Sequence, residues 1–149
     1  MCHASLILAV ALAAGIVPRA GAATDDEVMF HNLKASRILF LGNSITLHGP
    51  APAIGWEGHW GMAASAPDRD YVHLVVRAIA RAAGKEPRMR VTNIAKFERQ
   101  FQTYNIDKEL RTELEFRPDL VIVAIGENVP ALTSDQARSE FQTSLTRLL

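Results

Sequence analysis

Cysteine is nearly absent from this chain of 149 residues, and the single one lies at position 2. We expect Cys2 to be removed with a cleaved leader, so that the mature chain contains no thiol. Such a chain forms no disulfide, has no thiolate nucleophile and builds no cysteine-based zinc site. His48 and His59 have no acidic partners at the spacing of metal ligands, so we expect neither a metal nor another cofactor.

An excess of charge of either sign is also missing. The 16 Lys and Arg residues equal the 16 Asp and Glu residues, so the formal net charge is zero at pH 7. Domains that bind nucleic acid or anionic membranes usually carry a basic excess. No apolar run is long and clean enough to stay in a bilayer. We therefore expect no nucleic-acid partner and no stable membrane span once the leader has been cleaved.

The N-terminal segment has the pattern of a secretory signal peptide. Ala4–Val17 is almost wholly apolar, Pro18 breaks the run, and residues 20–23 offer small side chains for cleavage. A buried N-terminal helix is the alternative, but an acidic run begins where that helix would have to continue. We expect residues 1–23 to be a signal peptide of an exported protein, periplasmic or secreted, and residues 24–149 to form one domain.

Three short apolar runs predict β-strands. They cover residues 37–42, 90–95 and 119–126, and the third is the strongest. The runs are continuous rather than alternating, which indicates strands that are covered on both faces, as in a parallel sheet.

Helical patterns lie between and after these runs. The first stripe spans residues 72–79 and is followed by Gly84, a common helix stop. The second spans residues 106–114, and the third is predicted to begin at a capping box formed by Thr133 and Gln136. The positions expected to be buried on the third helix are Ala137, Phe141, Leu145 and Leu148. Alternating strands and helices predict a doubly wound α/β sheet in three layers, αβα.

A long loop rich in glycine and proline follows the first predicted strand, over Ile45–Asp68. Loops of this length in compact domains are usually functional or mobile. Trp56 and Trp60 within it either cover the loop or form a stacking wall for a sugar or acyl group. His48 and His59 either line the ligand site or hold the loop.

Two short polar motifs come directly after the first and third predicted strands. Gly42-Asn43-Ser44-Ile45 follows the first, and Gly126-Glu127-Asn128 follows the third. Either motif alone can be a simple turn. In a sheet of order 2-1-3, however, these strands are neighbours and the ligand crevice opens between them. We therefore expect Ser44 and Asn128 to face one crevice, with Gly42, Asn43 and Gly126 in support.

At these strand ends, the two motifs resemble the first and third sequence blocks of the SGNH/GDSL hydrolase family. The resemblance covers roughly residues 37–149 and implies a flavodoxin-like sheet and a serine hydrolase of acyl esters. Ser44 would be the nucleophile and an oxyanion donor through its N–H, and the Asn128 side chain would be a second donor. Export and the two tryptophans favour an ester of a small molecule or carbohydrate, such as an acetylated sugar.

The sequence departs from the family pattern in three places. Asn43 replaces the commoner aspartate, and in the second block Asn93 matches while Ala95 and Glu98 occupy glycine positions. The final D-x-x-H block is absent, so we expect the catalytic histidine and aspartate and the later strands to be missing, and the chain as given to be a very poor esterase. The residues expected to line the substrate are Trp56, Trp60, His48, His59 and Glu98.

Asp70-Tyr71-Val72-His73 also reads D-x-x-H, but it lies at the start of the first crossover helix. We interpret Asp70 as favouring the helix N-terminus and expect His73 to lie out of hydrogen-bond reach of Ser44. The alternative function is a non-catalytic binding module or an inactive truncated remnant on a flavodoxin-like fold. A flavin or nucleotide site is disfavoured because residues 42–46 are too poor in glycine and hydroxyl groups for a phosphate loop.

Overall fold

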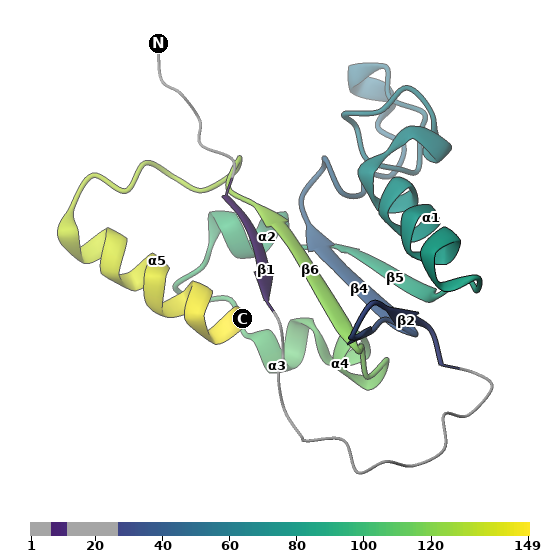
Figure 1. Cartoon of the computed structure of the whole chain (residues 1–149). Helices are drawn as coiled ribbons and strands as arrows, with labels where there is room; N and C mark the ends of the chain where they lie inside the picture. The colour runs from purple at the N-terminus through teal and green to yellow at the C-terminus, as the bar shows by residue number, and fades with distance from the viewer. Residues whose placement is uncertain (1–6, 12–26) are drawn as a thin grey trace.

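The computed structural model describes residues 7–11 and 27–149, which form a mixed α/β fold around a four-stranded sheet (Figure 1). The strand order is β1-β6-β4-β5. The bounds are β1 Ile7–Ala11, β4 Arg37–Gly42, β5 Arg88–Asn93 and β6 Leu120–Ile125. β4 pairs in parallel with both β5 and β6, which confirms the expected adjacency of the first and third predicted strands.

β1 falls within the segment expected to be a signal peptide, and it pairs antiparallel with β6. The remaining residues of that segment, 1–6 and 12–23, lie outside the described part of the chain. The cleavage of residues 1–23 therefore stays a prediction. A separate two-stranded hairpin, β2 Met29–Phe30 and β3 Leu33–Lys34, leads into β4 and was not expected from the sequence.

The continuous apolar run of β4 is explained by helices on both faces of the sheet (Figure 1). Ile38 and Phe40 are fully buried beside α1, Tyr71–Ala83, on one face. Leu39 and Leu41 are buried in a second cluster on the other face. The helices whose residues contribute to this second cluster are α2 Ala95–Arg99, α3 Ile106–Glu109 and α5 Asp135–Leu148. The short helix α4, Arg111–Glu115, follows α3.

The first predicted helix is confirmed as α1, and Gly84 ends it in the left-handed conformation at φ 71°. The second stripe does not form one helix, because the chain breaks at Leu110 between α3 and α4. The second strand begins two residues earlier than expected and ends at Asn93, because α2 starts at Ala95.

The predicted capping box of the last helix is wrong. Ser134, not Thr133, is the N-cap, and its hydroxyl accepts a hydrogen bond from Ala137 N at 3.1 Å. The helix also lies less deeply than expected. Phe141, Leu145 and Leu148 pack against the core but are only partly buried, and no residue of α5 is fully buried.

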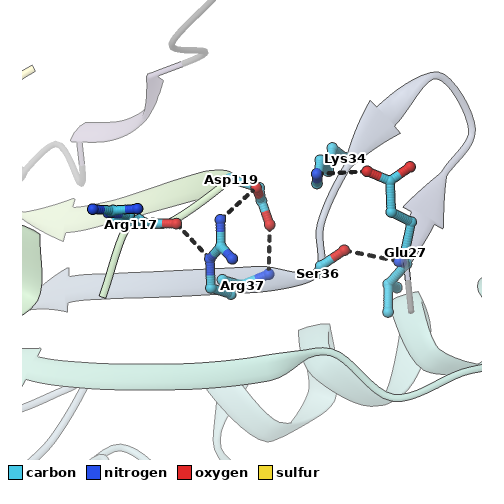
Figure 2. Close-up of polar contacts among 7 residues, drawn as sticks. Glu27, Lys34, Ser36, Arg37, Arg117 and Asp119 are labelled. Carbon is cyan, nitrogen blue, oxygen red and sulfur yellow. Dashed lines mark hydrogen bonds and ion pairs between the residues drawn. The ribbon is translucent and has the colours of Figure 1, made fainter. Parts of the chain in front are cut away.

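At the amino edge of the sheet, polar contacts join the starts of β4 and β6 (Figure 2). Asp119 accepts hydrogen bonds from Arg37 N at 2.9 Å and from the Arg37 guanidinium at 3.2 Å. Arg37 Nε also donates to the carbonyl of Arg117 at 2.5 Å. Nearby, Lys34 pairs with Glu27 at 2.6 Å. In the described residues, no helix has the length and apolar character needed to cross a membrane.

Candidate active site

Ser44 lies in the turn that directly follows β4, and it is partly exposed. Asn43 is fully buried, and its side-chain oxygen accepts a hydrogen bond from Ile45 N at 3.0 Å. This bond folds the backbone around Ser44 into an Asx-type turn. Among the described residues, the hydroxyl and the N–H of Ser44 have no hydrogen-bond partner. Both groups are therefore available to a ligand, as a nucleophile and an oxyanion donor require.

Gly42 is required by the close packing at the base of this turn. A Cβ atom on Gly42 would lie 1.8 Å from Thr46 Oγ1 and 2.7 Å from the carbonyl oxygen of Ala124. Thr46 is buried, and its hydroxyl is hydrogen-bonded to the hydroxyl of Tyr71 at 2.9 Å. Burial raises the pKa of Tyr71, against the opposing effect of the Thr46 hydrogen bond. The turn that carries Ser44 is thus fixed to β6 and to the start of α1.

The loop over Ile45–Asp68 is largely irregular, as expected, and it is tied back to the Ser44 turn. Met62 N donates to the carbonyl of Ser44 at 2.9 Å. At Gly61, an added Cβ would lie 2.0 Å from the carbonyl oxygen of Ile45, so the two backbones are in direct contact. Motion of this loop would therefore be transmitted to the backbone of Ser44.

Trp56 and Trp60 contact one another edge to face, with ring centroids 5.2 Å apart. Their indole N–H groups donate within the loop, to the carbonyls of His48 at 3.3 Å and Ala64 at 2.9 Å. His48 Nδ1 is hydrogen-bonded to a neighbouring carbonyl at 2.6 Å, and His59 is exposed. Both tryptophans hold the loop together, and each residue is only partly buried.

Asp70 and His73 form a local pair at the start of α1. The buried Asp70 carboxylate accepts hydrogen bonds from His73 N at 2.8 Å and from its ring Nδ1 at 2.7 Å. The other carboxylate oxygen accepts from Gly61 N at 3.4 Å. No hydrogen bond joins His73 to Ser44 in the part of the chain described, as expected. Asp70 is the helix N-cap, which agrees with its interpretation from the sequence.

Glu98 occupies the centre of the carboxyl edge, between the ends of β4 and β6. Its side chain is fully buried, so in this structure it does not face a ligand as a lining residue would. Its carboxylate accepts hydrogen bonds from Asn43 Nδ2 at 3.3 Å and from Gly126 N at 2.6 Å. Asn43 Nδ2 also donates to the carboxylate of Glu127. Asn43 thus lies between two carboxylates, where an aspartate would have no hydrogen to donate.

Asn128 is bound to the same carboxylate. Its backbone N–H donates to Glu98 Oε1 at 3.2 Å, and its side-chain Nδ2 donates to Glu98 Oε2 at 2.9 Å. On its other side, Asn128 Oδ1 accepts a hydrogen bond from Arg99 at 3.2 Å. The two motif loops, which are far apart in sequence, are therefore joined through one residue of α2.

The end of β5 supports this site through Asn93. The side-chain oxygen of Asn93 accepts a hydrogen bond from Ala95 N at 2.9 Å, which occupies that backbone donor. The Asn93 side-chain nitrogen donates to the carbonyl of Leu47 at 2.7 Å. Asn93 therefore supports the loop after Ser44, and Ala95 N–H is not free to bind an oxyanion.

Sequence reasoning named Glu98 but missed its role, gave Glu127 no role within its motif, and missed Arg99. Two hollows, of about 200 and 550 Å³, lie at the opposite, amino edge and are lined largely by charged residues such as Arg37 and Arg88. Neither contains Ser44 or Asn128.

Within residues 7–11 and 27–149, no three His, Cys, Asp or Glu side chains lie closely enough together to hold a metal ion.

Comparisons of the chain with protein-family models, with curated proteins and with solved structures found no match.

Proposed function

We propose that this chain carries the nucleophile and two oxyanion donors of an exported serine ester hydrolase of the SGNH/GDSL type, on a flavodoxin-like sheet. The observation that carries the proposal is the joint binding of both motif loops by one buried carboxylate. Asn43, beside Ser44, and Asn128 both donate to Glu98, at 3.3 and 2.9 Å. The free hydroxyl and N–H of Ser44 add support, because catalysis uses both.

The proposed chemistry is acyl transfer to Ser44. Its Oγ forms a bond to the ester carbonyl carbon while its proton passes to an imidazole base, and the bond to the alcohol oxygen then breaks as that oxygen regains the proton. In the tetrahedral intermediate, the oxyanion accepts from Ser44 N–H and from the Asn128 amide. Each such donor typically stabilises the transition state by about 3 kcal/mol. Water then releases the acyl group by the same steps.

A test of this chemistry must supply the general base from solution, because no histidine of the described residues is hydrogen-bonded to Ser44 Oγ. The chain would be incubated with p-nitrophenyl acetate, with and without added imidazole. Imidazole itself cleaves this ester, so the measurement is acetyl on the Ser44 peptide by mass spectrometry. We expect acetylation that depends on imidazole, and turnover without it on the order of a millionfold below that of a complete triad.

Three variants make this test specific. Ser44→Ala should abolish the adduct, and Asn128→Ala should slow its formation by about 10²- to 10³-fold. Ser65→Ala, an exposed serine of the same loop, is the matched control and should behave as the parent chain. No adduct on Ser44 at any imidazole concentration would favour the non-catalytic binding module. Rapid acetylation without imidazole that His73→Ala abolishes would instead identify His73 as the base.

A carbohydrate ester is the proposed substrate class. The supporting observation is the partly exposed pair Trp56 and Trp60 on the loop whose Met62 N–H binds the carbonyl of Ser44. Aromatic rings offer an apolar face with a polar edge, which suits a sugar ring. Acetylated xylo-oligosaccharide should therefore acetylate Ser44 better than an alkyl acetate does, and Trp56→Ala should lower the oligosaccharide rate more than the alkyl ester rate.

A further inference from the structure

Glu98 is a charged side chain with no exposure to solvent. Burying a carboxylate is strongly unfavourable unless hydrogen bonds replace the lost water. Here four N–H groups do so. Oε1 accepts from Asn43 Nδ2, Gly126 N and Asn128 N, at 3.3, 2.6 and 3.2 Å, and Oε2 accepts from Asn128 Nδ2 at 2.9 Å. All four partners are donors, so the group acts as an acceptor only, as a carboxylate does.

The two oxygens of Glu98 bind different groups. Oε1 accepts hydrogen bonds from two backbone N–H groups and from the Asn43 side-chain amide, and so joins the loops after β4 and β6. Oε2 has one partner, the side-chain amide of Asn128. This separation means that a change confined to Oε2 alters the Asn128 side chain first and the loop junction second.

The Asn128 amide is fixed from both sides. Its oxygen accepts from Arg99 at 3.2 Å, and its nitrogen donates to Glu98 at 2.9 Å. An amide nitrogen carries two hydrogens. One is used on Glu98, and the other is left for a ligand. A donor fixed before the reaction needs no reorganisation when charge develops, which is what makes oxyanion donors effective.

We propose that Glu98 is a positioning residue that orients the Asn128 amide so that its second N–H meets the oxyanion formed when Ser44 attacks an ester. The inference rests on the proposed function and deepens it. Glu98 does not touch the substrate and acts through Asn128. It also gives a reason for a glutamate at a glycine position, because glycine could not reach the amide at all.

The isosteric variant Glu98→Gln separates this role from loop packing. The new amide group must take the place of one oxygen. An NH2 group at the Oε1 position would face three N–H donors, so it takes the Oε2 position, where it faces only the Asn128 side-chain nitrogen. Asn128 must then rotate its amide or lose this hydrogen bond. The remaining oxygen, at the Oε1 position, still accepts the hydrogen bonds that join the two loops.

The experiment compares the imidazole-dependent acetylation rates of Ser44 in the parent chain, Glu98→Gln, Asn128→Ala and the double variant. We expect Glu98→Gln to slow acetylation by about 10²- to 10³-fold, like the loss of one oxyanion donor. The double variant should be no slower than Asn128→Ala, because Glu98 acts through that residue. Rate losses that multiply in the double variant would overturn the inference. Glu113→Gln, a partly buried carboxylate that binds two threonine hydroxyls, is the control and should leave the rate unchanged.

A second measurement requires no ester. The side-chain amide of Asn128 should shift in ¹⁵N–¹H NMR spectra of Glu98→Gln and keep its position in Glu113→Gln. An unmoved Asn128 signal would overturn the inference whatever Ser44 does. A moved signal in a chain whose Ser44 is never acetylated would support the orienting role and overturn the proposed function. If circular dichroism shows Glu98→Gln unfolded, Glu98→Asp, whose shorter carboxylate withdraws from Asn128, replaces it under the same criteria.

Discussion

The two edges of the sheet hold β4 and β6 together in different ways. At the carboxyl edge, the fully buried Glu98 binds both following loops, through a buried hydrogen bond from Asn43 and a partly buried one from Asn128. At the amino edge, the link is the Arg37–Asp119 pair, with side chains 37% and 10% exposed (Figure 2). Buried ionic groups are strongly destabilising when a partner is lost, whereas a pair that is open to solvent on one side is partly screened and contributes less. Substitution should therefore cost more stability at the carboxyl edge than at the amino edge.

The largest effect should come from Asn43→Asp. This change removes the hydrogens donated to Glu98 and Glu127 and adds a third carboxylate between them. We expect a loss of about 3 kcal/mol or more in the free energy of unfolding at pH 7. Urea unfolding followed by circular dichroism measures it.

Asn105→Asp is the matched control for that change. Asn105 caps α3 by accepting a hydrogen bond from Lys108 N at 3.0 Å, and aspartate caps helices equally well. Its stability should stay close to that of the parent chain. If Asn43→Asp were equally harmless, the carboxyl edge would be no more demanding than the amino edge and the comparison would fail.

A smaller effect is expected from Asp119→Asn at the amino edge. The amide keeps an acceptor for Arg37 N but loses the ion pair at 3.2 Å. We expect a loss of about 1 kcal/mol in the free energy of unfolding, which shrinks as salt is added. Denaturation at low and high ionic strength checks both points. A loss as large as that of Asn43→Asp would mean that the two edges do not differ in the way described.

Alkaline pH should weaken the packing beneath the carboxyl edge. Tyr104 packs edge to face on Phe97 of α2, and burial raises the pKa of Tyr104 to about 12. Its pKa in the unfolded chain is about 10. The folded state therefore holds this proton more tightly, so stability contributed by the neutral ring is full below pH 10 and declines as pH rises toward 12. Tyr104→Phe should flatten this decline, and stability curves that stay parallel from pH 9 to 12 would contradict the assignment.

The smallest effect is expected from Lys34→Ala. The pair with Glu27 is exposed on both sides, with side chains 46% and 34% accessible. Its hydrogen bond with Glu27 raises the pKa of Lys34, but solvent screens this interaction. The melting temperature should stay unchanged within error, and a clear decrease would show that the hairpin is more tightly coupled to the sheet than its exposure indicates.

The sequence predicted the parts of this molecule that local patterns encode. Apolar runs located β4 and β6 because buried parallel strands have no polar face, and the motifs after them were placed correctly at the strand ends. α2 was missed because five residues are too few to establish a helical period. The capping box at Thr133 was wrong because Ser134, one residue later, caps equally well.

The role of Glu98 could not be predicted for a different reason. A glutamate in a polar segment is usually exposed, and only the fold brings four donors to it from two loops far apart in sequence. The signal that could have pointed to it was a pair of departures from the SGNH/GDSL pattern that the sequence resembles, Asn43 for aspartate and Glu98 for glycine. These two residues contact each other at 3.3 Å, so each departure accommodates the other.

The contact between Trp56 and Trp60 has a consequence for spectroscopy. These are the only two tryptophans of the chain, and their rings lie 5.2 Å apart in the same loop. Indole fluorescence excited at long wavelength therefore comes from this loop and not from the sheet. An emission change on adding a ligand reports the environment of the segment bonded to the backbone of Ser44, without any engineered label. A fluorescence melting curve, for the same reason, follows the release of this loop and can precede the loss of the strands seen by circular dichroism.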